Sequence, residues 1–207
     1  MGVIEILSSR REYTKLNPIV VLLGKGDHQI TSSWTNSNGY ERQTTLGITC
    51  SNITFVGTGK DTTTVSGGFG IENVENITFK QMTVTNTTGQ GIHIRDAKVE
   101  LFNVALKLCG SAGLFISDST SETILVATRC EFSNNEYGAT VAGSLTSAKF
   151  NSCVFNANSG DGIFAYDEST IHLHGEATAI HSNENDGICA HSSGKVIIHL
   201  PSHHNTT

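Results

Sequence analysis

Residues 160–191 read GDGIFAYDESTIHLHGEATAIHSNENDGICAH, and one short pattern occurs twice within them. Asp161-Gly162-Ile163-x-Ala165 returns twenty-five residues later as Asp186-Gly187-Ile188-x-Ala190. Self-similarity at a fixed period of about 20–50 residues is the signature of repeat architectures. The pattern therefore indicates a chain built from equivalent units, and it can be followed outward in both directions.

A glycine recurs at one position of seven successive units. The spacing between neighbouring glycines is 21 to 25 residues, and most of them precede an apolar–x–apolar pair. Alternation with a period of two is typical of a strand with one buried face. The seven glycines are Gly47, Gly70, Gly91, Gly113, Gly138, Gly162 and Gly187.

Units of this size cannot bury an apolar face alone, but stacked units form one continuous core. Strands of neighbouring units would pair in parallel, and parallel crossovers are strongly right-handed. The sequence therefore predicts an all-β fold, a right-handed single-stranded parallel β-helix of about 7–8 coils. Like positions would form columns. One inward column would superpose Ile92, Leu114, Ala139, Ile163 and Ile188.

The G-[IL]-x-[IV] strand pattern and the asparagine-rich turns before it resemble the right-handed parallel β-helix, or pectate-lyase-like, superfamily over roughly residues 19–200. Asn134, Asn158 and Asn183 each stand four residues before a glycine and resemble the internal asparagine ladder of that superfamily. Stacked side-chain amides can hydrogen-bond from coil to coil and satisfy a tight turn. The motifs specify the fold and no particular enzyme family.

The 207 residues contain no linker-like stretch and predict a single β-helix domain. We expect residues 1–18 to form an N-terminal cap, 19–200 the coils, and 201–207 a tail or a point of truncation. An uncapped C-terminal coil could also form an oligomer, because open strand edges pair with other chains. Residues 31–45 are polar and non-periodic and predict a loop over one flank.

Composition and charge limit which partners and which cellular compartment are expected for this chain. The chain has 13 basic and 19 acidic residues without a basic stripe, so nucleic acid is not an expected partner. No apolar run is long enough to span a membrane. The amino terminus lacks a signal-peptide layout, so the localisation stays unknown: the chain is intracellular or a fragment without its leader. Five cysteines favour reduced thiols, and we expect Cys130 and Cys153 to share an inward column without a disulfide.

Aromatic side chains occupy outward positions of the first strand in several coils. Exposed aromatic planes can stack on the apolar faces of sugars while polar neighbours fix the orientation. A polysaccharide or protein partner is therefore expected there, unless a side loop packs on these residues. The candidate ligand-binding residues are Phe115, Phe164, Tyr166, His93 and His191.

Carboxylates also recur between coils and could act in catalysis. Stacked carboxylates can hold Ca²⁺ or serve as an acid and base pair. The resemblance implies Asp-bound calcium with an Arg or Lys base for lyases of acidic polysaccharides, and paired Asp for inverting hydrolases. The diagnostic motifs of both are absent, and Asp at a strand-to-turn junction commonly caps the turn. The candidates are Asp161, Asp186, Asp118, Asp167, Arg95 and Lys149.

Histidines concentrate near the carboxyl end, with seven of nine from His172 onward. His174 and His199 fall in one outward column twenty-five residues apart, with His172 or His203 nearby. Such a group could hold Zn²⁺ or Ni²⁺. The alternative is an exposed row of histidines without metal.

Two functions remain open. The favoured hypothesis is a non-catalytic β-helical rod that binds a carbohydrate or a protein partner or serves as a structural module. The alternative is a polysaccharide lyase or glycoside hydrolase that uses the surface carboxylates. No cofactor is expected, apart from Ca²⁺ if the protein is a lyase.

Overall fold

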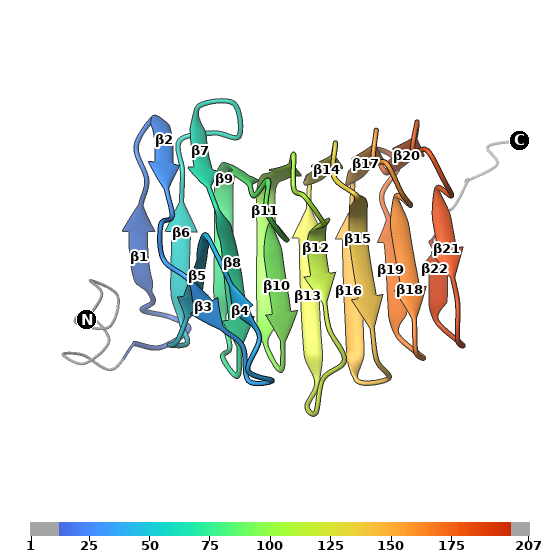
Figure 1. Cartoon of the computed structure of the whole chain (residues 1–207), viewed down its shortest axis with the longest axis horizontal. Coiled ribbons are helices and arrows are strands. Elements are labelled where there is room, and N and C mark those ends of the chain that lie inside the picture. Colours follow the sequence, from blue (N-terminus) through green and yellow to red (C-terminus); the bar gives the residue numbers. More distant parts are fainter. Residues whose placement is uncertain (1–12, 200–207) are drawn as a thin grey trace, which may run out of the picture.

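The computed structural model describes residues 13–199, which form short strands stacked in rungs along one long axis (Figure 1). These residues contain no helix, and so none that could cross a membrane. The predictions for residues 1–12 of the cap and for the tail at 201–207 lie outside the described residues.

The strands lie on three faces of a solenoid. Face A, on which the short hairpin β3 (Trp34–Thr35) and β4 (Glu41–Arg42) lies, is a seven-stranded parallel sheet. Its strands are β5 (Thr45–Ile48), β8 (Gly68–Glu72), β10 (Ile92–Arg95), β12 (Ala112–Ile116), β15 (Tyr137–Ala142), β18 (Ile163–Tyr166) and β21 (Ile188–Ala190).

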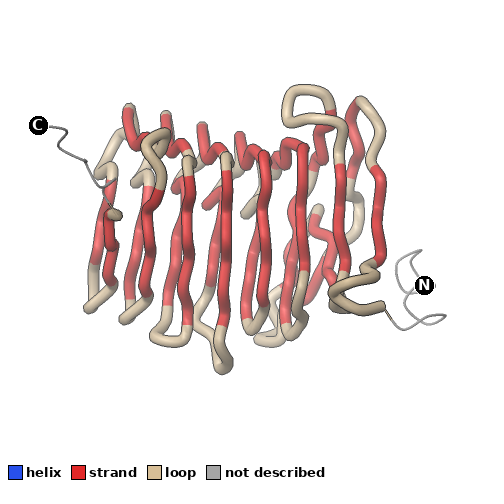
Figure 2. The backbone as a smooth tube through the Cα atoms, turned by 180° about the vertical axis from the view of Figure 1, so that it is seen from behind, coloured by secondary structure: helices blue, strands red, loops and turns tan. Residues whose placement is uncertain are grey.

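Face B is the main path of a second parallel sheet. Its strands are β1 (Ile19–Leu22), β6 (Ile53–Val56), β9 (Ile77–Thr85), β11 (Lys98–Lys107), β13 (Thr123–Thr128), β16 (Thr146–Asn151), β19 (Thr170–His174) and β22 (Lys195–Ile198). The long strands β9 and β11 continue from face B into face C, so both faces belong to one sheet. Face C also contains β2 (Gly26–Gln29), β7 (Thr63–Ser66), β14 (Glu131–Ser133), β17 (Val154–Asn156) and β20 (Ala179–His181). Figure 2 shows the rungs from behind, joined by short turns.

The register confirms the predicted inward column. Ile92 pairs with Leu114, Leu114 with Ala139, Ala139 with Ile163, and Ile163 with Ile188. Period-two alternation points these side chains into one core, where they add buried apolar area rung by rung. The chain makes about six complete turns of the solenoid between the first and the seventh strand of face A. This is slightly fewer than the 7–8 coils predicted, because the first and last coils are incomplete.

The predicted glycine column is wrong by two residues in its first two units. Gly70 pairs with His93, so Gly68, and not Gly70, lies beside Gly91. Gly47 pairs with Gly70, and both face outward beneath Trp34. A Cβ atom at either position would overlap the indole ring. These two glycines are therefore explained by close packing on the outer surface.

The predicted asparagine turn is shifted by one residue at its first member. Asn135, not Asn134, is buried, and its Nδ2 donates to the Leu106 carbonyl at 3.0 Å. Asn158 Nδ2 donates to Asn183 Oδ1 at 2.8 Å, and the backbone N–H of Asn135 donates to Asn158 Oδ1 at 3.0 Å. Six residues separate Phe132 from Ala139, whereas seven separate their register partners Phe155 and Ile163, so constant spacing from the glycine selects the wrong residue.

The bend from face B to face C uses one residue per rung in the left-handed region. Gln81, Asn103, Arg129 and Ser152 have φ between 53° and 56°. A single left-handed residue turns the chain sharply without ending the parallel pairing. Just beyond this bend Cys130 and Cys153 are buried in the shared inward column that was predicted, and no disulfide joins any of the five cysteines.

Candidate functional site

Residues 31–45 form the predicted loop over one flank, and the β3–β4 hairpin within it lies on face A. The backbone N–H of Ser37 donates to Glu72 Oε2 at 2.8 Å. Arg95 Nη1 donates to Ser37 Oγ at 2.8 Å and to Asn38 Oδ1 at 2.9 Å. Side chains of two adjacent rungs, β8 and β10, thus hold the hairpin on face A.

His93 lies beneath this hairpin and is only 3% exposed. Its ring meets Trp34 edge-on at 5.6 Å and Phe115 at 5.3 Å, and its Nε2 lies 3.0 Å from Ser117 Oγ. Burial, and then the charges of Arg42 and Arg95, lower the pKa of His93 to about 3. The predicted ligand-binding role of His93 is therefore corrected: the hairpin covers it, and it supports Phe115 from the side.

Arg95 and Asp96 hold neighbouring segments of chain in place. The Arg95 guanidinium contacts the hairpin, and its Nε lies 3.6 Å from Asp96 Oδ2. Asp96 Oδ1 accepts the backbone N–H groups of Thr120 at 2.7 Å and Ser121 at 2.6 Å. Burial raises the pKa of Asp96, but the hydrogen bonds from Ser121 and Thr120 together outweigh it, so the pKa is lowered. Arg95, a candidate base, is thus engaged in structural contacts.

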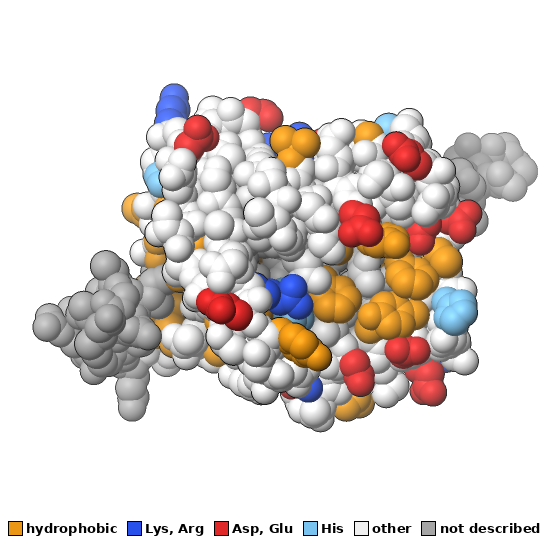
Figure 3. All heavy atoms as spheres, in the orientation of Figure 1, with side chains coloured by type: hydrophobic (Ala, Val, Ile, Leu, Met, Phe, Trp, Pro, Cys, Tyr) orange, Lys and Arg blue, Asp and Glu red, His pale blue; other side chains and the backbone are white. Residues whose placement is uncertain are grey.

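An aromatic strip lies on face A beyond the hairpin, toward the C-terminal end. We define it as Phe115, Tyr137, Phe164 and Tyr166, all of them half-buried. Phe164 and Tyr166 stack at 5.1 Å with planes 22° apart, and Tyr137 stacks on Phe164 at 6.3 Å and 25°. Figure 3 shows hydrophobic side chains gathered over this end of the visible face, with acidic side chains around them.

Tyr137 was missed by the sequence analysis. It stands directly before Gly138, whereas the candidates were chosen two and four residues after the glycine. The sequence signal that could have identified Tyr137 is an aromatic residue directly before a glycine of the repeat. His191, the remaining candidate, is exposed just after β21, where its Nδ1 lies 2.7 Å from Ser192 Oγ.

Carboxylates border the strip beyond the ends of its strands. Asp118 and Asp167 lie near the phenol of Tyr166, whose pKa is raised by burial and then by these two charges. Asp118 also occupies the space above Gly143, because a Cβ atom on that glycine would overlap its carboxylate. Gly143 therefore leaves room for a carboxylate next to the strip.

The second carboxylate pair lies before β18 and β21. The backbone N–H of Asp186 donates to Asp161 Oδ1 at 3.0 Å, and the Asp161 side chain is buried. Burial, followed by the charges of Asp161 and Asp186, raises the pKa of the nearby Cys189 thiol. Cys189 pairs with Phe164 in register, so this carboxylate pair lies at the edge of the aromatic strip.

Lys149 lies on a different face from the strip. It points outward from β16 on face B, where its register partner is His172. Within residues 13–199, no ion pair or hydrogen bond joins Lys149 to Asp118, Asp161, Asp167 or Asp186. The six predicted catalytic candidates are thus dispersed over two faces.

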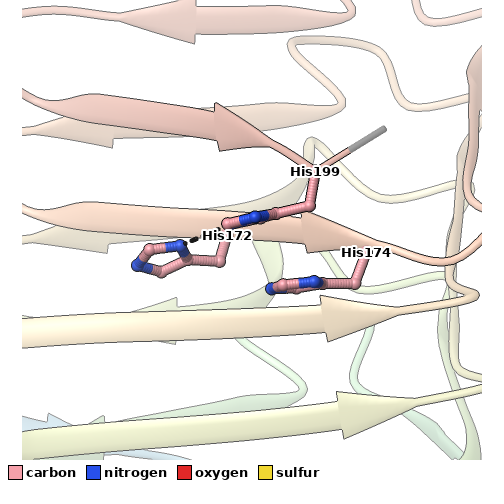
Figure 4. Close-up of side chains that lie close together, drawn as sticks. All are labelled: His172, His174 and His199. Carbon is pink, nitrogen blue, oxygen red and sulfur yellow. Dashed lines mark hydrogen bonds between the residues drawn. The ribbon is translucent and has the colours of Figure 1, made fainter. Parts of the chain in front are cut away.

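Three histidines meet on face B, as Figure 4 shows. His172 and His174 belong to β19, and His199 follows β22, so His174 and His199 share the column that was predicted. Their ligand atoms all lie within 4.8 Å of one another. The pKa of His174 is lowered by burial and then by the charges of His199, Lys149 and His172. His203, also considered for this group, lies outside the described residues.

Comparison with known proteins identifies the fold of the chain. A family model described as "Right handed beta helix region" matches residues 20–178. No curated protein matches the chain. Among solved structures, ORF18 of Geobacillus virus E2 is 11% identical with a TM-score of 0.44, over 88% of this chain and 52% of that one. The A-module of Azotobacter vinelandii mannuronan C-5 epimerase AlgE4 is 13% identical with a TM-score of 0.44, over 84% of this chain and 66% of that one. The chain thus spans about half of the first structure and just under two thirds of the second.

Proposed function

The chain belongs to the right-handed β-helix family, and from that scaffold we propose that it is a non-catalytic module that binds a carbohydrate along the aromatic strip of face A. Membership of a fold family does not decide function, so the proposal depends on the surface itself. The observation that carries it is the near-parallel stacking of the half-exposed Tyr137, Phe164 and Tyr166 on one face.

Aromatic side chains in this arrangement suit sugar rings. Phe164 and Tyr166 have few rotatable bonds, so they lose little conformational entropy when a ligand covers them. Phe164 pairs in register with Thr140 and Cys189 of the adjacent rungs, which fixes the position of its strand. We also propose that Asn135, Asn158 and Asn183 act as an asparagine ladder that keeps these rungs at constant spacing.

The charges around the strip favour a neutral glycan. Asp118 and Asp167 lie at one end of the strands, and Asp161 and Asp186 at the other. Carboxylates accept hydrogen bonds from sugar hydroxyl groups, but they repel the carboxylates of uronic acids. The net charge of −6 adds to that repulsion. A neutral oligosaccharide is therefore the proposed ligand.

The positions of the basic residues support a binding role over a lyase role. Arg95 is hydrogen-bonded to the β3–β4 hairpin, and Lys149 lies on face B. A general base must lie within hydrogen-bonding reach of the proton that it removes. In the part of the chain that the structure describes, neither residue forms an ion pair with Asp118, Asp161, Asp167 or Asp186.

The proposal is tested by calorimetric titration with neutral and acidic oligosaccharides of several linkages. The double variant Phe164→Ala/Tyr166→Ala is expected to lose at least about tenfold in affinity, equivalent to roughly 1.4 kcal/mol. The matched control is Phe102→Ala, which removes an aromatic side chain that is 40% exposed on face B. If the double variant keeps full affinity for every ligand of the native protein, the strip is not the binding surface.

A second assay separates binding from catalysis. Polysaccharides are incubated with the protein with and without Ca²⁺, and the products are followed by absorbance in the unsaturated-uronate band and by reducing ends. No turnover is expected. Product release that depends on Asp118, Asp161, Asp167 or Asp186 would establish the enzymatic alternative.

A further inference from the structure

His172, His174 and His199 bring three imidazole rings together on a surface that the proposed sugar site does not use. The rings of His174 and His199 stack at 3.9 Å with planes 7° apart, and His172 Nδ1 lies 2.9 Å from His199 Nε2 (Figure 4). Two residues come from one strand at positions i and i+2, so they share an outward face. The third comes from the next rung, which makes the cluster a product of the stacking.

The distances fit a metal ion after small side-chain rotations. Zinc–nitrogen bonds of about 2.0–2.1 Å in a tetrahedral site place two nitrogen ligands roughly 3.3 Å apart. The His172–His199 nitrogen pair is therefore slightly too close, and the third ligand atom lies within 4.8 Å of both. All three side chains reach solvent, so rotation of the rings meets no packed core.

The donor set selects the class of metal. Neutral imidazole is a borderline ligand that suits Zn²⁺, Ni²⁺ and Cu²⁺, whereas Ca²⁺ and Mg²⁺ require oxygen ligands. We propose that His172, His174 and His199 form a Zn²⁺ site, with a fourth position open to water, that ties β22 to β19. The ion takes the place of the proton shared between the His172 and His199 rings, and this proton moves through solvent to the other nitrogen of its own ring, so both ligands stay neutral imidazoles.

Coordination at this position would stabilise the last described rung. β22 pairs with β19 on one side, and its Ile197 and Ile198 side chains are exposed. Strands with few buried contacts open locally more often than the strands of the core. A metal ion that links His199 to β19 adds a second attachment beyond the backbone ladder, so opening of β22 becomes rarer.

Lys149 is the charged neighbour that weakens the site. Lys149 lies on β16, the strand that precedes β19, and is the register partner of His172. Its charge is one of the causes that lower the pKa of His174. An ammonium group in that position repels a divalent cation. Removing its charge with Lys149→Gln is therefore expected to raise the affinity for Zn²⁺ severalfold.

The test is titration of the metal-stripped full chain with ZnCl₂ against a competing chromophoric chelator. One Zn²⁺ per chain is expected, and His172→Gln, His174→Gln and His199→Gln are each expected to weaken binding at least tenfold. The matched controls are His181→Gln, an exposed histidine of face C, and the double variant His203→Gln/His204→Gln. Both controls are expected to retain the native affinity.

Hydrogen exchange of β22 is a second measurement, and Zn²⁺ bound at another site on the protein would not change it. Zn²⁺ is expected to slow amide exchange in Lys195–Ile198 of the native protein and to have no such effect in His174→Gln. Absence of one-to-one binding, loss of binding only in the His203/His204 variant, or dimerisation of the chain on adding Zn²⁺ would each overturn the proposal. Sugar binding by Phe164 and Tyr166 is expected to be unchanged in all histidine variants.

Discussion

Trp34 covers His93: the indole meets the imidazole edge-on, with ring centroids 5.6 Å apart and planes at 72°. The indole also lies over Gly47 and Gly70, so it spans three successive rungs of face A. Trp34 is the only tryptophan of the chain. Its fluorescence therefore reports directly on whether the β3–β4 hairpin is closed over His93.

Stability is expected to fall in acid because His93 is buried in its neutral form. Its pKa is lowered from 6.5 to about 3, so between these values the unfolded chain takes up a proton that the folded chain does not. The contribution is complete above pH 6.5 and is lost progressively as the pH falls toward 3, by at most about 5 kcal/mol. Arg42 and Arg95 face the ring, and their charges oppose its protonation.

Urea denaturation at several pH values measures this contribution. His93→Gln is expected to flatten the decline between pH 6.5 and 4 relative to the native protein, whereas His181→Gln is expected to leave it unchanged. Without urea, Trp34 fluorescence of the native protein is expected to stay unchanged over the same range, because the folded protein keeps His93 neutral until the pH approaches 3. Equal slopes in all three proteins would contradict the pKa assigned to His93.

A methyl group at Gly70 is expected to displace the hairpin. The added Cβ would overlap the Trp34 ring, and overpacking of this kind costs about 1–3 kcal/mol. Gly70→Ala should therefore lower the free energy of unfolding and shift Trp34 fluorescence to the red. Gly24→Ala is the matched control, because no heavy atom lies within 4 Å of its added Cβ. A native spectrum for Gly70→Ala would contradict the close contact.

Removal of the Asn158 side chain is expected to destabilise the stack. This fully buried amide donates to the Phe132 carbonyl and to Asn183 Oδ1, and accepts the backbone N–H of Asn135. Asn158→Ala leaves those groups unsatisfied and should cost about 2–4 kcal/mol in chemical denaturation. Asn134→Gly is the control, since Asn134 is exposed and its φ of 56° suits glycine. Equal losses in the two variants would show that the amide contacts add no stability.

Neutralising Asp186 is expected to make Cys189 more reactive. Burial and then the charges of Asp161 and Asp186 raise the pKa of this thiol, so Asp186→Asn should lower the pKa and increase the thiolate fraction at pH 8. Alkylation of the native protein with iodoacetamide, followed by peptide mass spectrometry, measures the rate at Cys189 alone. Cys109, Cys130 and Cys153 are buried and should react only after unfolding. An unchanged Cys189 rate would place Asp186 too far away to act on the thiol.

The sequence by itself determined the stack. Alternation with a period of two and unit lengths of 21–25 residues predict stacked coils with one inward column of side chains. The strand register confirms that column, which consists of Ile92, Leu114, Ala139, Ile163 and Ile188. The same periodicity placed His174 beside His199 and Cys130 beside Cys153. These predictions succeed because side-chain direction in a regular strand depends only on position along the strand.

Only the tertiary structure decided what covers the stack and which turn residue points inward. Burial of His93 depends on a hairpin that begins fifty-nine residues earlier, at Trp34, and its two supporting glycines look in the sequence like members of the repeat. Asn135 replaces Asn134 because one turn is a residue shorter than the others, and Lys149 proves remote from the carboxylates because its strand belongs to another face. Loop packing and turn length have no period, so a rule derived from the repeat cannot specify them.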